Sequence, residues 1–153
     1  MVAPRSYFLV GDVGATNARL AITALRDGAV EWIHEVRVPD AELSSFDDAI
    51  DTLFAASPVE RTRVAAACLR VAGPIRDHRA RFTHRDWTID AEAIAAMLGG
   101  KSVKLVNDLE AAAAGIDALD ERDLTVLQRR PAGRGGARLV IGAGTGLGVA
   151  YAV

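Results

Sequence analysis

The chain contains a single cysteine and no apolar run long enough to cross a membrane. One cysteine excludes an intrachain disulfide, and because Cys68 lies within the apolar run 64–69 we expect a buried, unreactive thiol. The first residues lead directly into a short strand-like run and lack the apolar segment of a signal peptide. These absences predict a cytoplasmic protein with no membrane partner.

The chain also lacks an excess of charge of either sign. Its 18 Lys and Arg residues against 20 Asp and Glu give a formal net charge of -2, which provides no general attraction to nucleic acid. We therefore expect no nucleic-acid partner, and we interpret the arginine- and glycine-rich segment 129–138 as a surface loop. The three histidines lack the paired spacing of zinc ligands. With 50% hydrophobic residues, the chain should fold around a real core.

Two common nucleotide-binding motifs are absent, but two other glycine-rich turns are present. No Walker A motif occurs, and Leu147 stands where a dinucleotide-binding motif would need its last glycine. The turns 11–17 and 142–148 each follow an apolar run and each contain a threonine. Glycine permits positive φ angles and lets backbone amides approach a phosphate. The alternative, that each is an ordinary hairpin loop, stays open on the residues alone.

Side chains within these turns add chemistry that suits a phosphate. Asp12 would repel a bare phosphate but would suit a Mg²⁺ ion shared with one, so we assign it to a metal. Thr16 and Thr145 can donate hydroxyl hydrogen bonds to a phosphate, and Asn17 can contribute an amide. The backbone positions expected to bind the phosphates of a nucleotide are Gly11, Gly14, Gly142, Gly144 and Gly146.

An amide and a carboxylate, Asn107 and Asp108, follow the apolar run 103–106, where a helix is expected to begin. A positioned carboxylate can accept the proton of an alcohol that attacks phosphorus, and Asn107 can orient the same substrate. Aspartate is also a common helix cap, so Asp108 is either a catalytic base or a cap.

The pattern of apolar residues predicts an α/β fold. Alternation predicts an antiparallel meander of three strands, and the nearly continuous apolar run 64–71 predicts a strand covered by helices on both faces. Ser44 or Ser45 should cap one helix, Asp90 should cap a second that ends at Gly99 and Gly100, and a third should span 110–119. The expected strands of the meander are 7–10, 18–23 and 30–38.

Four segments together resemble the bacterial glucokinases, which are ATP-dependent hexose kinases of the actin-like ATPase superfamily. The order and separation of the segments agree with that family, and the matches span nearly the whole chain. The segments are 9–21 (LVGDVGATNARLA), 72–75 (AGPI), 106–108 (VND) and 142–150 (GAGTGLGVA).

The resemblance implies that turns 11–17 and 142–148 are two phosphate-binding hairpins that close on ATP from two domains. It also implies that Asp108 is the base for the sugar 6-hydroxyl, that Asn107 binds sugar hydroxyls, and that Gly73 and Pro74 shape the sugar side of the cleft. Glucose as substrate, ATP and Mg²⁺ as cofactors, and a homodimer of the full-length protein follow from the same resemblance.

The implied fold is an actin-like ATPase (ribonuclease H-like) domain with a mixed sheet flanked by helices, followed by the first strands of a second, truncated domain. We predict a small α/β domain over 1–119, a connector over 120–138 and the start of the large domain over 139–153. Further sugar- and adenosine-binding segments of the family would follow the second hairpin. Apolar residues from about Leu139 onward should therefore be exposed in the isolated chain. A non-catalytic nucleotide- or sugar-binding module and an inert fragment are the alternatives to a kinase.

Two residues depart from the family pattern. Ala15 stands where a second glycine is usual, which reduces backbone freedom beside the phosphate. His84 replaces an amide side chain in a segment that precedes Trp87.

Overall fold

The computed structural model describes residues 5–14, 16–82, 87–128, 137–143 and 147–152. These form two compact units, Met1–Asn107 and Asp108–Val153, which are described separately. Ala15, His84, Gly144, Thr145 and Gly146 lie outside the described residues. Among the helices that the structure does describe, none is long and apolar enough to cross a membrane.

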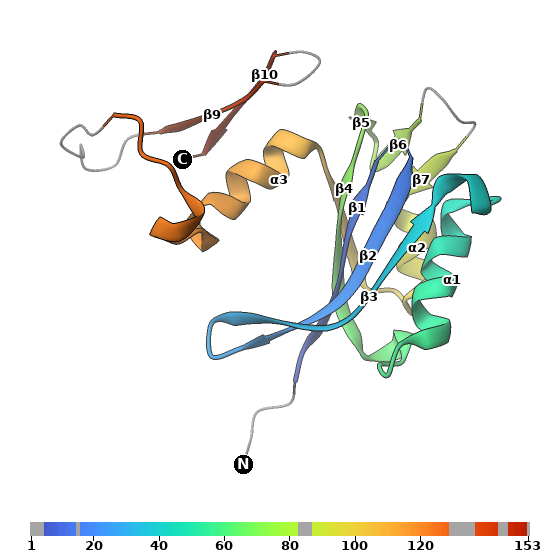
Figure 1. Cartoon of the computed structure of the whole chain (residues 1–153). Helices are drawn as coiled ribbons and strands as arrows, with labels where there is room; N and C mark the ends of the chain where they lie inside the picture. Colours follow the sequence, from blue (N-terminus) through green and yellow to red (C-terminus); the bar gives the residue numbers. More distant parts are fainter. Residues whose placement is uncertain (1–4, 15, 83–86, 129–136, 144–146, 153) are drawn as a thin grey trace. The chain divides into compact units, whose positions relative to one another are not determined.

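The first unit is built on a five-stranded mixed sheet with the strand order β3-β2-β1-β4-β8 (Figure 1). Strands β1, β2 and β3 form the predicted antiparallel meander, whereas β4 and β8 run parallel to β1. The strands are β1 (Tyr7–Val13), β2 (Asn17–Arg26), β3 (Ala29–Pro39), β4 (Val64–Val71) and β8 (Ser102–Val106). Because β1, β4 and β8 are parallel, their carboxyl ends lie at the same edge of the sheet.

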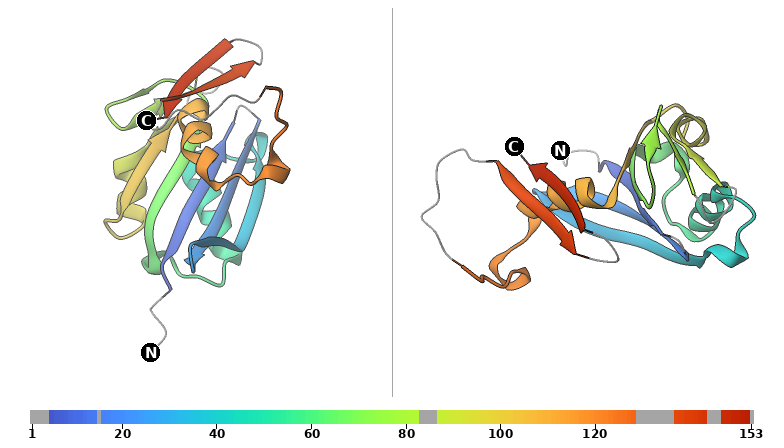
Figure 2. Two further views of the ribbon diagram at one scale, coloured as in Figure 1. Left: turned by 90° about the vertical axis from the view of Figure 1, so that its left-hand side faces the viewer. Right: turned by 90° about the horizontal axis from the view of Figure 1, so that it is seen from above.

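Two helices, α1 (Phe46–Ala56) and α2 (Ala91–Met97), cover one face of this sheet (Figures 1 and 2). Ser45 caps α1 through a reciprocal pair of bonds with Asp48, and the Asp90 carboxylate caps α2 by accepting from the Glu92 amide at 2.9 Å. Both predicted caps are thus confirmed. The core between helices and sheet contains fully buried Leu9, Leu20, Ile22, Ile50, Leu53 and Leu69.

The opposite face of the sheet shows that two related predictions were wrong. From Ala67 to Val71 the residues of β4 alternate between buried and more exposed positions, and Cys68 is exposed, so neither a strand buried on both faces nor a buried thiol is observed. The physical reason is that Ala66 and Cys68, on the open face of β4, have small side chains, which give an apolar sequence pattern without being covered. Trp32, at 61% exposure, lies on the same open face.

A small three-stranded sheet between β4 and α2 was not predicted. It consists of β5 (Ile75–Arg76), β6 (Arg79–Arg81) and β7 (Thr88–Asp90). Strands of two or three residues are too short to show alternation, which is why the sequence pattern does not reveal them. The turn between β5 and β6 contains Asp77 and His78 with φ of 49° and 60°, values that non-glycine residues seldom adopt.

The second unit contains α3 (Asp108–Gly115), two 3₁₀ turns, η3 (Ile116–Ala118) and η4 (Glu121–Asp123), and the antiparallel pair β9 (Arg138–Ala143) and β10 (Leu147–Ala152). Helix α3 ends at Gly115, earlier than the predicted residue 119. It belongs to the same compact unit as the strands that follow it. The predicted domain boundary at residue 119 stays a prediction. Leu139, Ile141, Leu147, Val149 and Tyr151 are exposed, as expected for this end of the isolated chain.

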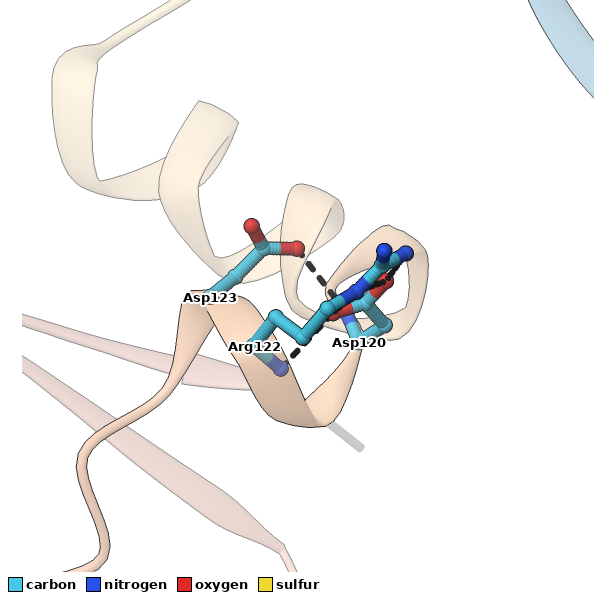
Figure 3. Close-up of polar contacts among 3 residues, drawn as sticks. All are labelled: Asp120, Arg122 and Asp123. Carbon is cyan, nitrogen blue, oxygen red and sulfur yellow. Dashed lines mark hydrogen bonds and ion pairs between the residues drawn. The ribbon is translucent and has the colours of Figure 1, made fainter.

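The connector after α3 is ordered by local polar contacts (Figure 3). The Asp120 carboxylate accepts a hydrogen bond from the Arg122 amide at 2.7 Å and pairs with the Arg122 guanidinium, while the Asp120 amide donates to the Asp123 carboxylate at 3.0 Å. The hydrogen bond from the Arg122 side chain is the main cause that lowers the pKa of Asp120 below its ordinary value. This pattern is a capping box that closes η4.

Candidate functional site

The first glycine turn connects β1 to β2, and backbone hydrogen bonds hold both of its ends. The Gly14 amide donates to the Asn17 carbonyl at 3.1 Å, and the Ala72 amide donates to the Val13 carbonyl at 3.0 Å. A third bond, from the Asp40 amide to the Thr16 carbonyl at 3.0 Å, ties the turn to the end of β3. The turn is therefore fixed against the ends of two other strands of the sheet.

The predicted side chains of this turn lie at the surface. Thr16 is exposed, and its hydroxyl oxygen accepts a hydrogen bond from the side-chain amide nitrogen Nδ2 of Asn17 at 2.9 Å. Asp12 is 53% exposed and lies at the last position but one of β1. Both the hydroxyl and the carboxylate are accessible to a small ligand.

The described glycines of the two turns differ from the prediction in their backbone conformation. Among the described residues, Gly11, Gly14 and Gly142 do not have the positive φ that the sequence argument invoked. Gly11 lies within β1, and a Cβ there would stand 2.6 Å from Leu20 Cδ2 and 2.7 Å from Leu69 Cδ2. At Gly11 the structure therefore requires glycine for packing, because two fully buried leucines occupy the space of a side chain.

Gly73 and Pro74 follow β4 at the same edge of the sheet as the first turn. Gly73 has a φ of 148°, a value that favours glycine, and both residues are exposed. Asn107 follows β8 and is also exposed. The first turn, the Gly73–Pro74 segment and Asn107 thus follow three neighbouring parallel strands at one sheet edge, where ligands of open α/β sheets commonly bind.

Arg70 and Arg19 are two residues of this edge that the sequence analysis did not single out. Asp12 is the register partner of Arg19 on β2 and of Arg70 on β4, and it forms an ion pair with Arg70. Arg19 donates to the Glu35 carboxylate at 2.6 Å, which holds the pKa of Glu35 below its ordinary value. A lone charged residue within the apolar run 64–71 was the signal that could have identified Arg70.

The donor set around Asp12 suits a metal ion only together with a phosphate ligand. Within the described part of the chain, no group of three or more His, Cys, Asp or Glu side chains is placed to hold a metal ion. Mg²⁺ commonly binds proteins through one or two carboxylates and completes its shell with substrate phosphates and water. A single accessible carboxylate beside a candidate phosphate turn fits that pattern.

In the second unit, Asp108 is the first residue of α3 and is exposed. Its Oδ1 atom accepts a hydrogen bond from the Leu109 amide at 2.9 Å. This bond is compatible with the helix-cap interpretation and leaves the catalytic one untested, because one carboxylate has several acceptor sites.

Leu109, the neighbour of Asp108, packs on the strand pair of the second turn. Gly142 and Gly148 are direct partners across β9 and β10. A Cβ at Gly142 would stand 2.8 Å from Leu109 Cδ2, and one at Gly148 would lie even closer to Leu109 Cδ1. These two glycines let the helix that carries Asp108 approach the strands that carry the second turn.

Replacing Gly148 with alanine is therefore expected to destabilise the packing of α3. The added methyl group would displace Leu109, and overpacking of this kind typically costs about 1–3 kcal/mol. Amide hydrogen exchange of α3 should accelerate by about tenfold, and Leu109→Ala in the same chain should restore part of the protection.

Gly115→Ala provides the matched control for this experiment, because nothing lies within 4 Å of the position where its Cβ would be added. Alanine is the better helix former, so exchange of α3 should slow slightly. Unchanged exchange in Gly148→Ala would show that Leu109 does not hold α3 on the strands.

The sheet order and the turns at its parallel edge are those of an α/β domain of the actin-like ATPase class. The family model for glucokinase matches residues 9–153, so the chain belongs to the glucokinase family. The glucokinase of Hahella chejuensis is 40% identical over 147 residues, covering 94% of this chain and 43% of that protein. The chain therefore spans less than half the length of this relative.

Solved structures agree with the family. A glucokinase from an Antarctic psychrotroph matches with a TM-score of 0.84 and 27% identity, over 95% of this chain and 46% of that one. The glucokinase of Balamuthia mandrillaris, solved in complex with glucose, matches with a TM-score of 0.65 and 25% identity, over 98% of this chain and 45% of that one. The predicted fold class is confirmed.

Proposed function

We propose that this chain is the N-terminal part of a glucokinase that transfers the γ-phosphoryl group of ATP to the 6-hydroxyl of glucose. The match of the glucokinase family over residues 9–153 carries the proposal. It is supported by a relative that was solved with glucose bound, and by candidate phosphate and sugar segments that follow neighbouring parallel strands.

In this proposal the residues of the two units have separate roles. The amides and the Thr16 hydroxyl of the first turn bind phosphate oxygens, and Asn107 with the Gly73–Pro74 segment binds and orients the sugar. Asp108 accepts the proton of the 6-hydroxyl as that oxygen attacks phosphorus in line with the leaving group. Residues 142–146 of the second turn, with Thr145, bind the nucleotide phosphates from the other domain.

Mg²⁺ bound with the nucleotide would neutralise phosphate charge, and Asp12 is the residue that would hold it. Two observations support this role: Asp12 lies near the end of β1, just before the candidate phosphate turn, and its exposed carboxylate is accessible to such an ion. A homodimer and a cytoplasmic location belong to the same proposal.

The proposal is tested with a protein that contains this chain together with the remaining length of the family. We expect glucose-dependent ADP production by that protein and little or none by the 153-residue chain, since the chain covers less than half of its relatives. Sustained turnover by the 153-residue chain would contradict the second expectation. For the 153-residue chain, calorimetry that shows glucose or ATP binding without turnover would favour a sensing module, and no binding at all would favour an inert fragment.

A further inference from the structure

We propose that Arg70 is a positioning residue of the first phosphate turn, which orients the Asp12 carboxylate and contributes positive charge to nucleotide phosphates. As a consequence, nucleotide binding depends less on Mg²⁺ than it would if Asp12 had no arginine beside it. The inference rests on the proposed role of the first turn in binding phosphate.

The charged residues at this edge form one row across the sheet. Register pairs Arg37 of β3 with Arg19 of β2, Arg19 with Asp12 of β1, and Asp12 with Arg70 of β4. Three arginines and one aspartate give the row a formal charge of +3 − 1 = +2, which Glu35, bonded to Arg19, reduces to +1. A surplus of positive charge therefore lies across the strands that lead into the turn.

Arg70 and Asp12 precede two of the candidate ligand segments directly. Asp12 is followed by Val13 and the first turn, Arg70 is followed by Val71 and the Ala72–Pro74 segment, and the bond from the Ala72 amide to the Val13 carbonyl joins the two segments. Because parallel strands end at the same edge, a phosphate held by the turn amides would lie near both side chains. The Arg70 and Asp12 side chains are 34% and 53% exposed, so both are accessible to a ligand.

The guanidinium group suits both partners. Its five N–H donors can serve a carboxylate on one side and phosphate oxygens on another, which the single ammonium of lysine does less well. While Arg70 engages the Asp12 carboxylate, a Mg²⁺ ion must share that carboxylate with it. Removal of the guanidinium should therefore weaken metal-free nucleotide binding and enlarge the benefit of adding Mg²⁺.

The experiment measures ATP affinity of the longer protein that contains this chain and the remaining length of the family, by calorimetry, once in EDTA and once in excess Mg²⁺. For Arg70→Ala we expect the Kd in EDTA to rise by about five- to tenfold, the range expected for loss of a charge-assisted hydrogen bond at an accessible site. The ratio of the Kd in EDTA to the Kd in Mg²⁺ should rise by at least the same factor. Arg70→Lys should give an intermediate Kd in EDTA, because it keeps the charge but loses the planar fork.

Arg61→Ala is the matched control. Arg61 pairs with Asp51 at 2.6 Å, with side-chain exposures of 34% and 60% that resemble those of Arg70 and Asp12, and it lies on the short turn before β4. Its replacement should leave both ATP affinities unchanged, and thermal unfolding of each variant verifies that the fold is retained.

The proposal is overturned if Arg70→Ala leaves the Kd in EDTA within twofold, or if the unsubstituted longer protein does not bind ATP in EDTA. It is also overturned if affinity falls equally with and without Mg²⁺, which a merely structural ion pair would produce. Failure of the proposed function would appear separately, as absence of phosphoryl transfer to glucose by the longer protein.

Discussion

Replacing Asp108 with asparagine in the full-length protein is expected to lower kcat for glucose phosphorylation by about 10²–10⁴-fold, the usual contribution of a general base. Asparagine can still accept the hydrogen bond that Asp108 receives from the Leu109 amide, so the start of α3 should keep its structure. Because the carboxylate is not needed to bind the nucleotide, the Kd for ATP should change less than twofold. Steady-state kinetics and calorimetry measure the two quantities.

Asp123→Asn is the control for this substitution. Asp123 belongs to the second unit, as Asp108 does. Its carboxylate likewise accepts a backbone hydrogen bond, from the Asp120 amide at 3.0 Å (Figure 3). Its replacement should leave kcat unchanged. If Asp108→Asn retained activity within about fivefold of the unsubstituted protein, Asp108 would be a helix cap and the base would lie elsewhere.

Replacing Gly11 with valine is expected to lower the free energy of unfolding of the first unit by about 2–3 kcal/mol, the upper part of the range for overpacked cores. The new side chain would collide with Leu20 and Leu69, both fully buried between the sheet and its helices. A loss of this size is a large fraction of the 5–15 kcal/mol that typically stabilises a domain. Urea unfolding measured by circular dichroism gives the free energy.

Two further variants decide whether packing is the cause. Gly14→Ala should change stability by less than about 0.5 kcal/mol, because the nearest atom to its Cβ would be the Asn17 carbonyl oxygen at an ordinary 3.7 Å. Leu69→Ala alone should cost about 2–5 kcal/mol, but combined with Gly11→Val it should cost less than the sum of the two single changes. Strict additivity would rule out the collision.

The glycine turns illustrate how far sequence reasoning reached at the candidate site. Their number and spacing correctly marked the β1–β2 connection, but the reason assigned to Gly11 was conformational freedom, whereas the structure shows a packing requirement. A sequence contains no information on which buried leucines meet a given backbone position, because Leu20 and Leu69 come from two other strands.

Local order explains which elements could be predicted. The caps at Ser45 and Asp90 and the alternation of the first three strands depend on residues close together in the chain, and the structure confirms them. The exposure of Cys68 could not be predicted, because small side chains on an open sheet face resemble those of a covered one.

The sequence by itself determined the first three strands, the two capped helices, the positions of the glycine turns, and the resemblance to glucokinases that the family match then confirmed. Only the tertiary structure showed that Arg70 pairs with Asp12, and that Leu109 occupies the space left by Gly142 and Gly148. The physical reason is that strand register and helix packing join residues separated by tens of positions. Asp12 and Arg70, 58 residues apart in the chain, become neighbours only when β1 and β4 pair.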